Sequence, residues 1–252
     1  MTHGLTLDHA AWSSPWRGRS VRDKAVLSLG LLLAAVSLPP FPGGVVVAAV
    51  SLVLLLGPIR VGWARLCRII WLPLVSILIG VATVAISLSW EGGPKLQLTA
   101  AGVTMAGALA VRAVAATLAT FILACSTPMV DLLSALSRAR VPDPLIEIAA
   151  LIYRFTFGLL ESAGAIHAAQ EARLGYSSRA AAMRSASMGV TMLFVRSWDG
   201  ARRLEDGLAG RGYEDSLRTL EPGRVRSARF LAASIVLLIG IIGATLAWEV
   251  LR

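Results

Sequence analysis

The chain has 252 residues, of which 56% are hydrophobic and only 15% are charged. Soluble domains carry roughly 25% charged residues, and the mean hydropathy of +0.71 is too high for a chain that meets water over most of its surface. This composition excludes an intrinsically disordered protein. The presence of only two cysteines, Cys67 and Cys125, excludes a disulfide scaffold. We therefore expect an integral membrane protein.

The formal net charge is +9, and two classes of protein carry such an excess. Nucleic-acid-binding domains are basic, and bacterial inner-membrane proteins keep Lys and Arg in their cytoplasmic loops. Here the basic residues gather in the first 24 residues, in the segment 60–68 and after residue 126. Because these segments lie between apolar stretches, the charge pattern favours membrane topology over nucleic-acid binding.

The first apolar stretch predicts a helical hairpin. It carries no charge from Ala25 to Ile59 and is interrupted by the Pro- and Gly-rich segment 39–44. The predicted arms are Lys24–Leu38 and Gly43–Gly57. Each arm has about 15 residues, whereas about 20 are needed to cross a bilayer. Two short spans in a thinned bilayer and a re-entrant pair therefore both stay open.

Three further apolar segments predict membrane spans. Ile69–Ser89 is uncharged and has Pro73 near its start, where a missing N–H matters least. Leu96–Thr127 is interrupted only by Arg112, and Phe230–Trp248 is the last span. No part of the chain shows a strand pattern by this interpretation.

Arg112 is the one charge inside these predicted spans. A charged side chain near the middle of a bilayer is costly, so such residues face protein or reach the interface. One reading is that Arg112 contacts backbone carbonyls or a partner subunit. The other is that the long span is shifted and Arg112 extends to the headgroups. The sequence favours neither.

The segment 128–228 interleaves charged and apolar residues in the manner of amphipathic helices. Thr127-Pro128 predicts the start of a first short helix, and Asp143-Pro144 the start of a second. The second helix is expected to run from Leu145 to about Arg173 and to end at Gly175. A third is expected from Ser178 to Leu208, before Gly210.

These elements predict an all-α integral membrane protein with about five transmembrane helices and a cytoplasmic helical region before the last span. Placing the basic loops inside puts the N-terminus in the cytoplasm. The expected parts are a cytoplasmic N-terminal segment (1–24), the first four transmembrane helices (25–127), the cytoplasmic helices (128–228) and the last transmembrane helix with a short tail (229–252).

Several kinds of chemistry have no counterpart in the sequence. There is no phosphate-binding loop, and His3, His9 and His167 lack the spacing of a metal site. The predicted spans contain no Asp, Glu or His, which ion-coupled transporters place near the midplane. If this protein uses ATP, we therefore expect another subunit to bind it, and a self-contained secondary transporter is disfavoured. These features argue against an integral-membrane enzyme and a standalone permease, which remain the alternatives of a different class.

Two segments of the predicted cytoplasmic region place an arginine among small residues at a helix end. They are Ala172-Arg173-Leu174-Gly175 and Gly210-Arg211-Gly212. Small neighbours let a partner backbone approach, and a guanidinium then bonds a carboxylate or exposed carbonyls. A solvated arginine that only complements the helix dipole is the simpler explanation of either segment alone.

The two segments, with their order, spacing and membrane context, resemble the paired Ala-Arg-Gly-like motifs of the transmembrane T component of energy-coupling factor (ECF) transporters, in particular its cobalt-type, CbiQ-like branch. The chain departs from the strict triplet at Leu174 in the first segment. It departs at Gly210, in place of Ala, in the second.

The resemblance implies a non-catalytic coupling subunit in the bacterial cytoplasmic membrane that binds no metal or cofactor itself. Its partners would be a pair of ABC-type ATPases, which bind ATP and Mg, a membrane substrate-capture subunit and a small accessory membrane subunit. Arg173 and Arg211 would insert into grooves of the two ATPases. The implied cargo is cobalt, and nickel or a vitamin is the alternative within the same family.

Overall fold

The computed structural model describes residues 8, 10–89, 95–98, 100–212 and 227–250. Contacts within the chain divide it into two compact units. Unit 1 comprises Met1–Leu132 and Pro222–Arg252, and unit 2 comprises Leu133–Glu221. The N-terminal residues His3 and His9 lie outside the described residues.

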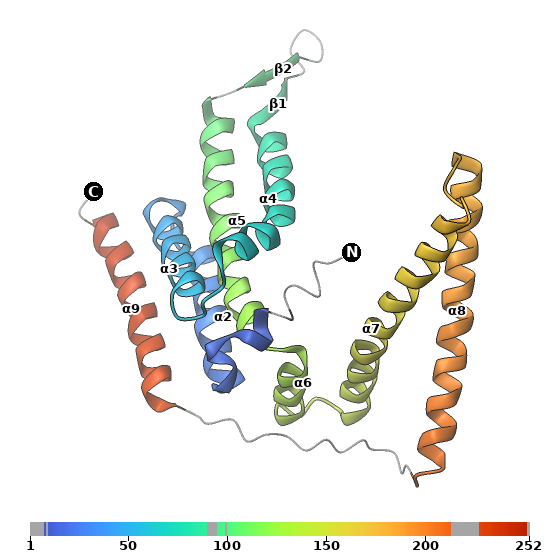
Figure 1. The fold of residues 1–252 in the computed structure, drawn as a ribbon. Coiled ribbons are helices and arrows are strands. Elements are labelled where there is room, and N and C mark those ends of the chain that lie inside the picture. The colour runs from blue at the N-terminus through green and yellow to red at the C-terminus, as the bar shows by residue number, and fades with distance from the viewer. Residues whose placement is uncertain (1–7, 9, 90–94, 99, 213–226, 251–252) are drawn as a thin grey trace. The chain divides into compact units, whose positions relative to one another are not determined.

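Unit 1 consists mainly of helices (Figure 1). Its helical elements are η1 (Pro15–Gly18), α2 (Val21–Ser37), η2 (Pro40–Gly44), α3 (Val45–Leu56), α4 (Trp63–Ala85), α5 (Ala100–Ser126) and α9 (Ala228–Val250). The long helix α5 packs against α2, α3 and α4, while α2 also packs against α9. Leu27 and Leu31 of α2 and Ala119 and Ile122 of α5 belong to the buried core. Small residues such as Ala119 allow helix backbones to approach closely.

Three of the described helices are long and apolar enough to cross a membrane: α4, α5 and α9. Helix α2 has 17 residues and α3 has 12, which at 1.5 Å per residue gives about 26 and 18 Å. Both are shorter than a hydrocarbon core of about 30 Å. The predicted hairpin is present, with η2 at its Pro-rich bend, and the prediction of an all-α membrane protein is confirmed.

The start of α4 was predicted wrongly. The helix begins at Trp63, after Gly62, and not at Ile69. It includes Arg65 and Arg68, because a charge-free window finds the membrane-embedded part of a helix and not its first turns. Pro73 therefore lies in the helix interior rather than near its start.

A short antiparallel hairpin follows α4, although the sequence reading found no strand. Strand β1 (Ile86–Ser89) pairs with β2 (Lys95–Leu98), with Leu88 opposite Leu96 and Ser87 opposite Gln97. Both segments alternate apolar and polar residues, which is the strand period. The alternation is hard to detect in the sequence because each segment adjoins a long apolar stretch that predicts a membrane span.

Unit 2 holds most of α6 (Met129–Arg138), together with α7 (Asp143–Ala172) and α8 (Arg179–Ala209). Helices α7 and α8 pack side by side as an antiparallel pair (Figure 1). Ser178 caps α8, its side chain accepting the Ala181 N–H at 3.2 Å. The predicted ends of both helices hold to within two residues, although Pro142 and not Asp143 is the N-cap of α7.

Candidate functional site

The first arginine segment forms the end of α7. Ala172 is the last helical residue, and Arg173 is the C-cap. Leu174 has a left-handed backbone (φ 58°). The Gly175 N–H donates to the Gln170 carbonyl at 2.8 Å, and the Leu174 N–H donates to the Glu171 carbonyl at 3.0 Å. This pair of bonds is the Schellman arrangement, in which a left-handed residue closes the helix.

The second segment ends α8 in a related way. Gly210 is the C-cap, the Arg211 N–H donates to the Leu208 carbonyl at 3.0 Å, and the Gly212 N–H donates to the Ala209 carbonyl at 3.2 Å. Gly212 has a left-handed backbone (φ 69°). In both segments the arginine therefore comes directly before a left-handed residue.

This shared conformation gives a physical reason for glycine in the third place of an Ala-Arg-Gly pattern. Glycine adopts the left-handed region without penalty, whereas an L-residue with a Cβ incurs a cost of roughly 1–2 kcal/mol. Leu174 takes this conformation despite the cost, with 74% of its side chain exposed. The departure from the triplet therefore preserves the backbone geometry that presents Arg173.

A network of hydrogen bonds stabilises the turn between α7 and α8 that follows Arg173. The Gln170 amide nitrogen donates to the Ser185 carbonyl, the Tyr176 hydroxyl donates to Gln170 Oε1, and Ser185 Oγ donates to the Gly175 carbonyl, each at 2.8 Å. The rings of His167 and Tyr176 are in edge contact at 4.6 Å. These bonds join the end of α7 to the first turns of α8.

Sequence reasoning missed Gln170 and Ser185. Their positions in the chain carry no local pattern, because they meet only when α7 and α8 fold together. Gly175 shows how close the packing is. A Cβ at this position would lie 2.6 Å from Ser185 Oγ and 2.8 Å from the Gln170 carbonyl oxygen. Glycine at this position is therefore favoured by the lack of space for a side chain.

Arg173 ends α7 just before α8 begins, Arg211 follows the far end of α8, and both are exposed. Helix α8 has 31 residues, which corresponds to a length of about 46 Å. The two guanidinium groups therefore belong to separate sites. Each arginine follows a helix C-terminus, where a cation is favoured by the helix dipole and remains available to a carboxylate or carbonyl of another chain.

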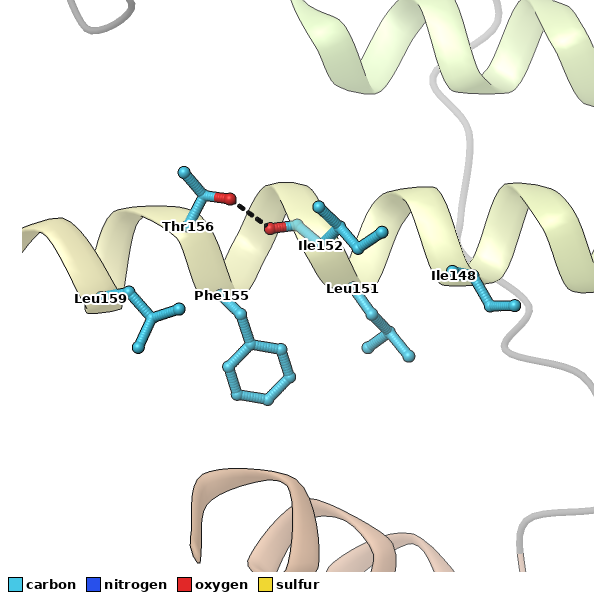
Figure 2. Close-up of a pocket in the computed structure, with 6 residues that line it drawn as sticks. All are labelled: Ile148, Leu151, Ile152, Phe155, Thr156 and Leu159. Atoms are coloured by element: carbon cyan, nitrogen blue, oxygen red, sulfur yellow. Dashed lines mark hydrogen bonds between the residues drawn. The ribbon is translucent and has the colours of Figure 1, made fainter. Parts of the chain in front are cut away.

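The α7–α8 pair also exposes large apolar side chains. A shallow groove of about 290 Å³ runs along α7. Figure 2 shows its lining side chains, with Leu151 and Phe155 projecting from the same side of the helix. The groove is lined by Ile148, Leu151, Ile152, Phe155, Thr156 and Leu159.

Helix α8 adds a second apolar surface. Val190, Phe194 and Trp198 follow one another at intervals of four residues, so they share a face, and each is more than half exposed. The Phe194 and Trp198 rings stack with centroids 6.3 Å apart. Large exposed apolar surfaces mark sites of interaction with protein or membrane.

Arg112 lies in the middle of α5 and is partly buried. Its Nη2 donates to the Leu38 carbonyl at 3.3 Å. Leu38 is the C-cap of α2, whose last carbonyls lack partners within the helix. This contact agrees with the interpretation in which Arg112 binds backbone carbonyls.

The remaining candidate chemistry concerns metal ions. In the described parts of the chain, no three His, Cys, Asp or Glu side chains gather as a potential metal site.

Comparison with known proteins gives a consistent answer. The sequence pattern of the CbiQ cobalt transport proteins matches residues 13–220. The chain belongs to the CbiQ family. It is 39% identical over 239 residues to the cobalt transport protein CbiQ of Rhodobacter capsulatus, which covers 95% of this chain and 97% of that protein.

Two further relatives extend the comparison. The CbiQ protein of Salmonella typhimurium is 34% identical over 75% of this chain and 88% of its own length. A putative fused cobalt transport protein, CbiMQ, of Methanocorpusculum labreanum is 29% identical over 82% of this chain, and the match covers 36% of the fused protein. Membership of this family and the three apolar helices α4, α5 and α9 make the chain a multi-pass membrane protein of a transport family.

Proposed function

We propose that this chain is the transmembrane coupling subunit of an ATP-driven, ECF-type cobalt importer. It is a non-catalytic subunit that transmits movement from a pair of ABC-type ATPases to a membrane subunit that captures the metal. The ATPases bind ATP and Mg. The observation that carries the proposal is the matched pair of helix-end arginines, Arg173 and Arg211, each directly before a left-handed residue at the end of a long helix of unit 2.

The geometry of unit 2 supports two docking points. One arginine precedes α8 and the other follows it, and this helix of 31 residues is about 46 Å long, so each arginine can serve one of two ATPases. A helix braced at one end by the Gln170–Tyr176–Ser185 network transmits displacement without bending at that turn. Movement of a rigid packed element is a common way to couple distant sites.

The apolar surfaces of α7 and α8 support a membrane partner. The groove at Leu151 and Phe155, and the face that contains Phe194, suit an apolar surface that a membrane subunit presents on its cytoplasmic side. The fused relative from Methanocorpusculum labreanum supports the same assignment, because it joins a CbiQ-like part to a second transport protein part in one chain. The charge pattern supports a cytoplasmic N-terminus and a cytoplasmic unit 2, on the side of the membrane where ATPases act.

The test is charge reversal at the two helix ends. Arg173→Glu and Arg211→Glu should leave the protein in the membrane, weaken ATPase association at least about tenfold each and abolish uptake together, because charge pairs at an interface contribute several kcal/mol. Arg196→Glu is the matched control, since Arg196 is an exposed arginine in the middle of α8. The measurements are co-purification of ATPase subunits from membranes and uptake of radioactive Co²⁺.

Unchanged uptake in the double variant would refute the coupling role. Competition of Co²⁺ uptake by Ni²⁺ decides the cargo in the same cells. A stronger effect of Ni²⁺ than of unlabelled Co²⁺ would contradict the cobalt assignment while leaving the coupling role intact.

A further inference from the structure

Two consecutive residues in the first turn of α2, Asp23 and Lys24, are buried although both carry charge. Asp23 is 7% exposed and Lys24 is 0% exposed. Burial of a charge is costly unless hydrogen bonds and opposite charge compensate it. The hydrogen-bond partners of these two side chains therefore indicate their structural role.

Lys24 binds the end of α5. Its Nζ donates to the carbonyl of Ser126 at 2.8 Å, and Ser126 is the last residue of that helix and fully buried. The last carbonyls of a helix lack intrahelical partners and form the negative end of its dipole. A lysine is the complementary group for this position.

Asp23 binds the start of α9. Its Oδ2 accepts the backbone N–H of Ser227 at 3.3 Å, and Ser227 in turn caps the helix by accepting the Phe230 N–H on its hydroxyl at 3.3 Å. The first N–H groups of a helix are free of intrahelical partners and form its positive end. The negative charge of Asp23 thus complements the positive start of α9, and the positive charge of Lys24 complements the negative end of α5.

These two helix ends have a special place in the chain. Helix α5 is the last complete helix before the chain passes into unit 2 after Leu132, and α9 is the first helix after it returns at Pro222. The facing ends of these two helices, at Ser126 and Ser227, are thus bonded, within unit 1, to adjacent residues of α2. Asp23 and Lys24 therefore bring the end of α5 and the start of α9 together on one turn of α2.

We propose that Asp23 and Lys24 form a double clamp that holds the exit from α5 and the entry to α9 in fixed register, so that movement of unit 2 reaches the membrane helices instead of fraying their ends. The proposal makes both residues positioning residues and rests on the proposed coupling function. Its structural part, the clamping of two helix ends, does not depend on that function.

A matched control lies one turn further along α2. Ser28 Oγ donates to the Ala119 carbonyl at 2.8 Å and both groups are buried. This bond joins the same two helices, α2 and α5, but inside α5 and away from its end. Ser28→Ala therefore removes a buried contact between α2 and α5 without opening either connection to unit 2.

The experiment uses the complete transporter in lipid nanodiscs and measures backbone hydrogen exchange together with Co²⁺ taken up per ATP hydrolysed. Asp23→Ala should speed exchange of the amides at 227–230 at least about tenfold, the effect of losing a hydrogen bond to a charged group. Lys24→Met should do the same for the last amides of α5, at 123–126. Both should lower uptake per ATP, whereas Ser28→Ala should leave both readouts near wild type.

Asp23→Asn is the rescue variant, because its amide oxygen still accepts the Ser227 N–H, and it should restore much of the exchange protection and the uptake ratio. If Lys24→Met fails to accumulate, the Asp23 pair of variants decides the question alone. Unchanged exchange at both helix ends would overturn the clamp. Faster exchange with an unchanged uptake ratio would overturn the positioning role.

Failure of the coupling function itself has a different signature. In that case the wild-type chain neither retains ATPases nor supports uptake, and the exchange measurements on the purified chain still decide whether Asp23 and Lys24 clamp the two helix ends.

Discussion

The two units of this protein are stabilised in different ways. In unit 1, helices α2 and α5 bury side chains on the faces that meet, including Leu27, Leu31 and Ile122. In unit 2, helices α7 and α8 contain 30 and 31 residues, and none of these residues is buried. Unit 1 thus has a buried core, whereas α7 and α8 contact each other through partly exposed side chains, helix caps and a few polar bonds.

This difference indicates that unit 2 is the part of the chain that depends on partner proteins. A packed core resists deformation, because its side chains fill the space between the helices. A helix pair with exposed apolar faces reaches its full stability only with partners that cover those faces. We therefore expect unit 1 to keep its structure in the isolated chain and unit 2 to become rigid on assembly.

The largest expected effect tests the difference in stability between the two units. Leu31→Ala removes a fully buried side chain of the unit 1 core and should lower the free energy of unfolding by about 2–4 kcal/mol. Phe194→Ala, at a side chain of α8 that is 66% exposed, should lower it by less than about 0.5 kcal/mol and yet weaken complex assembly. Thermal unfolding of the purified chain in detergent and co-purification measure the two effects. Equal losses of stability would contradict the contrast.

A smaller effect is expected at the turn between α7 and α8. Gly175→Ala places a Cβ against Ser185 Oγ and the Gln170 carbonyl and should destabilise the turn by about 1–3 kcal/mol. Gly164→Ala is the matched control, because Gly164 lies inside α7 with nothing within 4 Å of the added Cβ. It should stabilise α7 by about 0.5–1 kcal/mol. Hydrogen exchange of the amides at 170–176 distinguishes the opposite signs.

The smallest expected effect concerns the backbone at Arg173. Leu174→Gly relieves a left-handed leucine and should stabilise the end of α7 by about 0.5–1 kcal/mol, the steric gain being reduced by the greater freedom of glycine in the unfolded chain. Met183→Gly, in the first turns of α8, should instead cost about 1 kcal/mol. Protease resistance of the turn is the measurement, and a loss of resistance in Leu174→Gly would show that its side chain matters more than its backbone.

Local sequence signals predicted much of the helical structure. Ser178 as a cap, Gly175 just after the end of α7 and Gly210 at the end of α8 located those helices to within two residues. These signals work because caps and left-handed residues act over a few neighbouring positions. The start of α4 at Trp63 and the hairpin of β1 and β2 were missed, since hydropathy windows describe the surroundings of a segment more directly than its backbone.

The sequence by itself determined the membrane class, the helical composition and the two arginine segments, because hydrophobicity, charge and helix-end residues are properties of short stretches. Only the tertiary structure decided the long-range partners. Gln170 meets Ser185 across a turn, Arg112 meets the Leu38 carbonyl, and Asp23 and Lys24 hold helix ends that are 204 and 102 residues away along the chain. The physical reason is that a buried polar group needs a partner, but its own neighbourhood does not specify which distant backbone group will supply it.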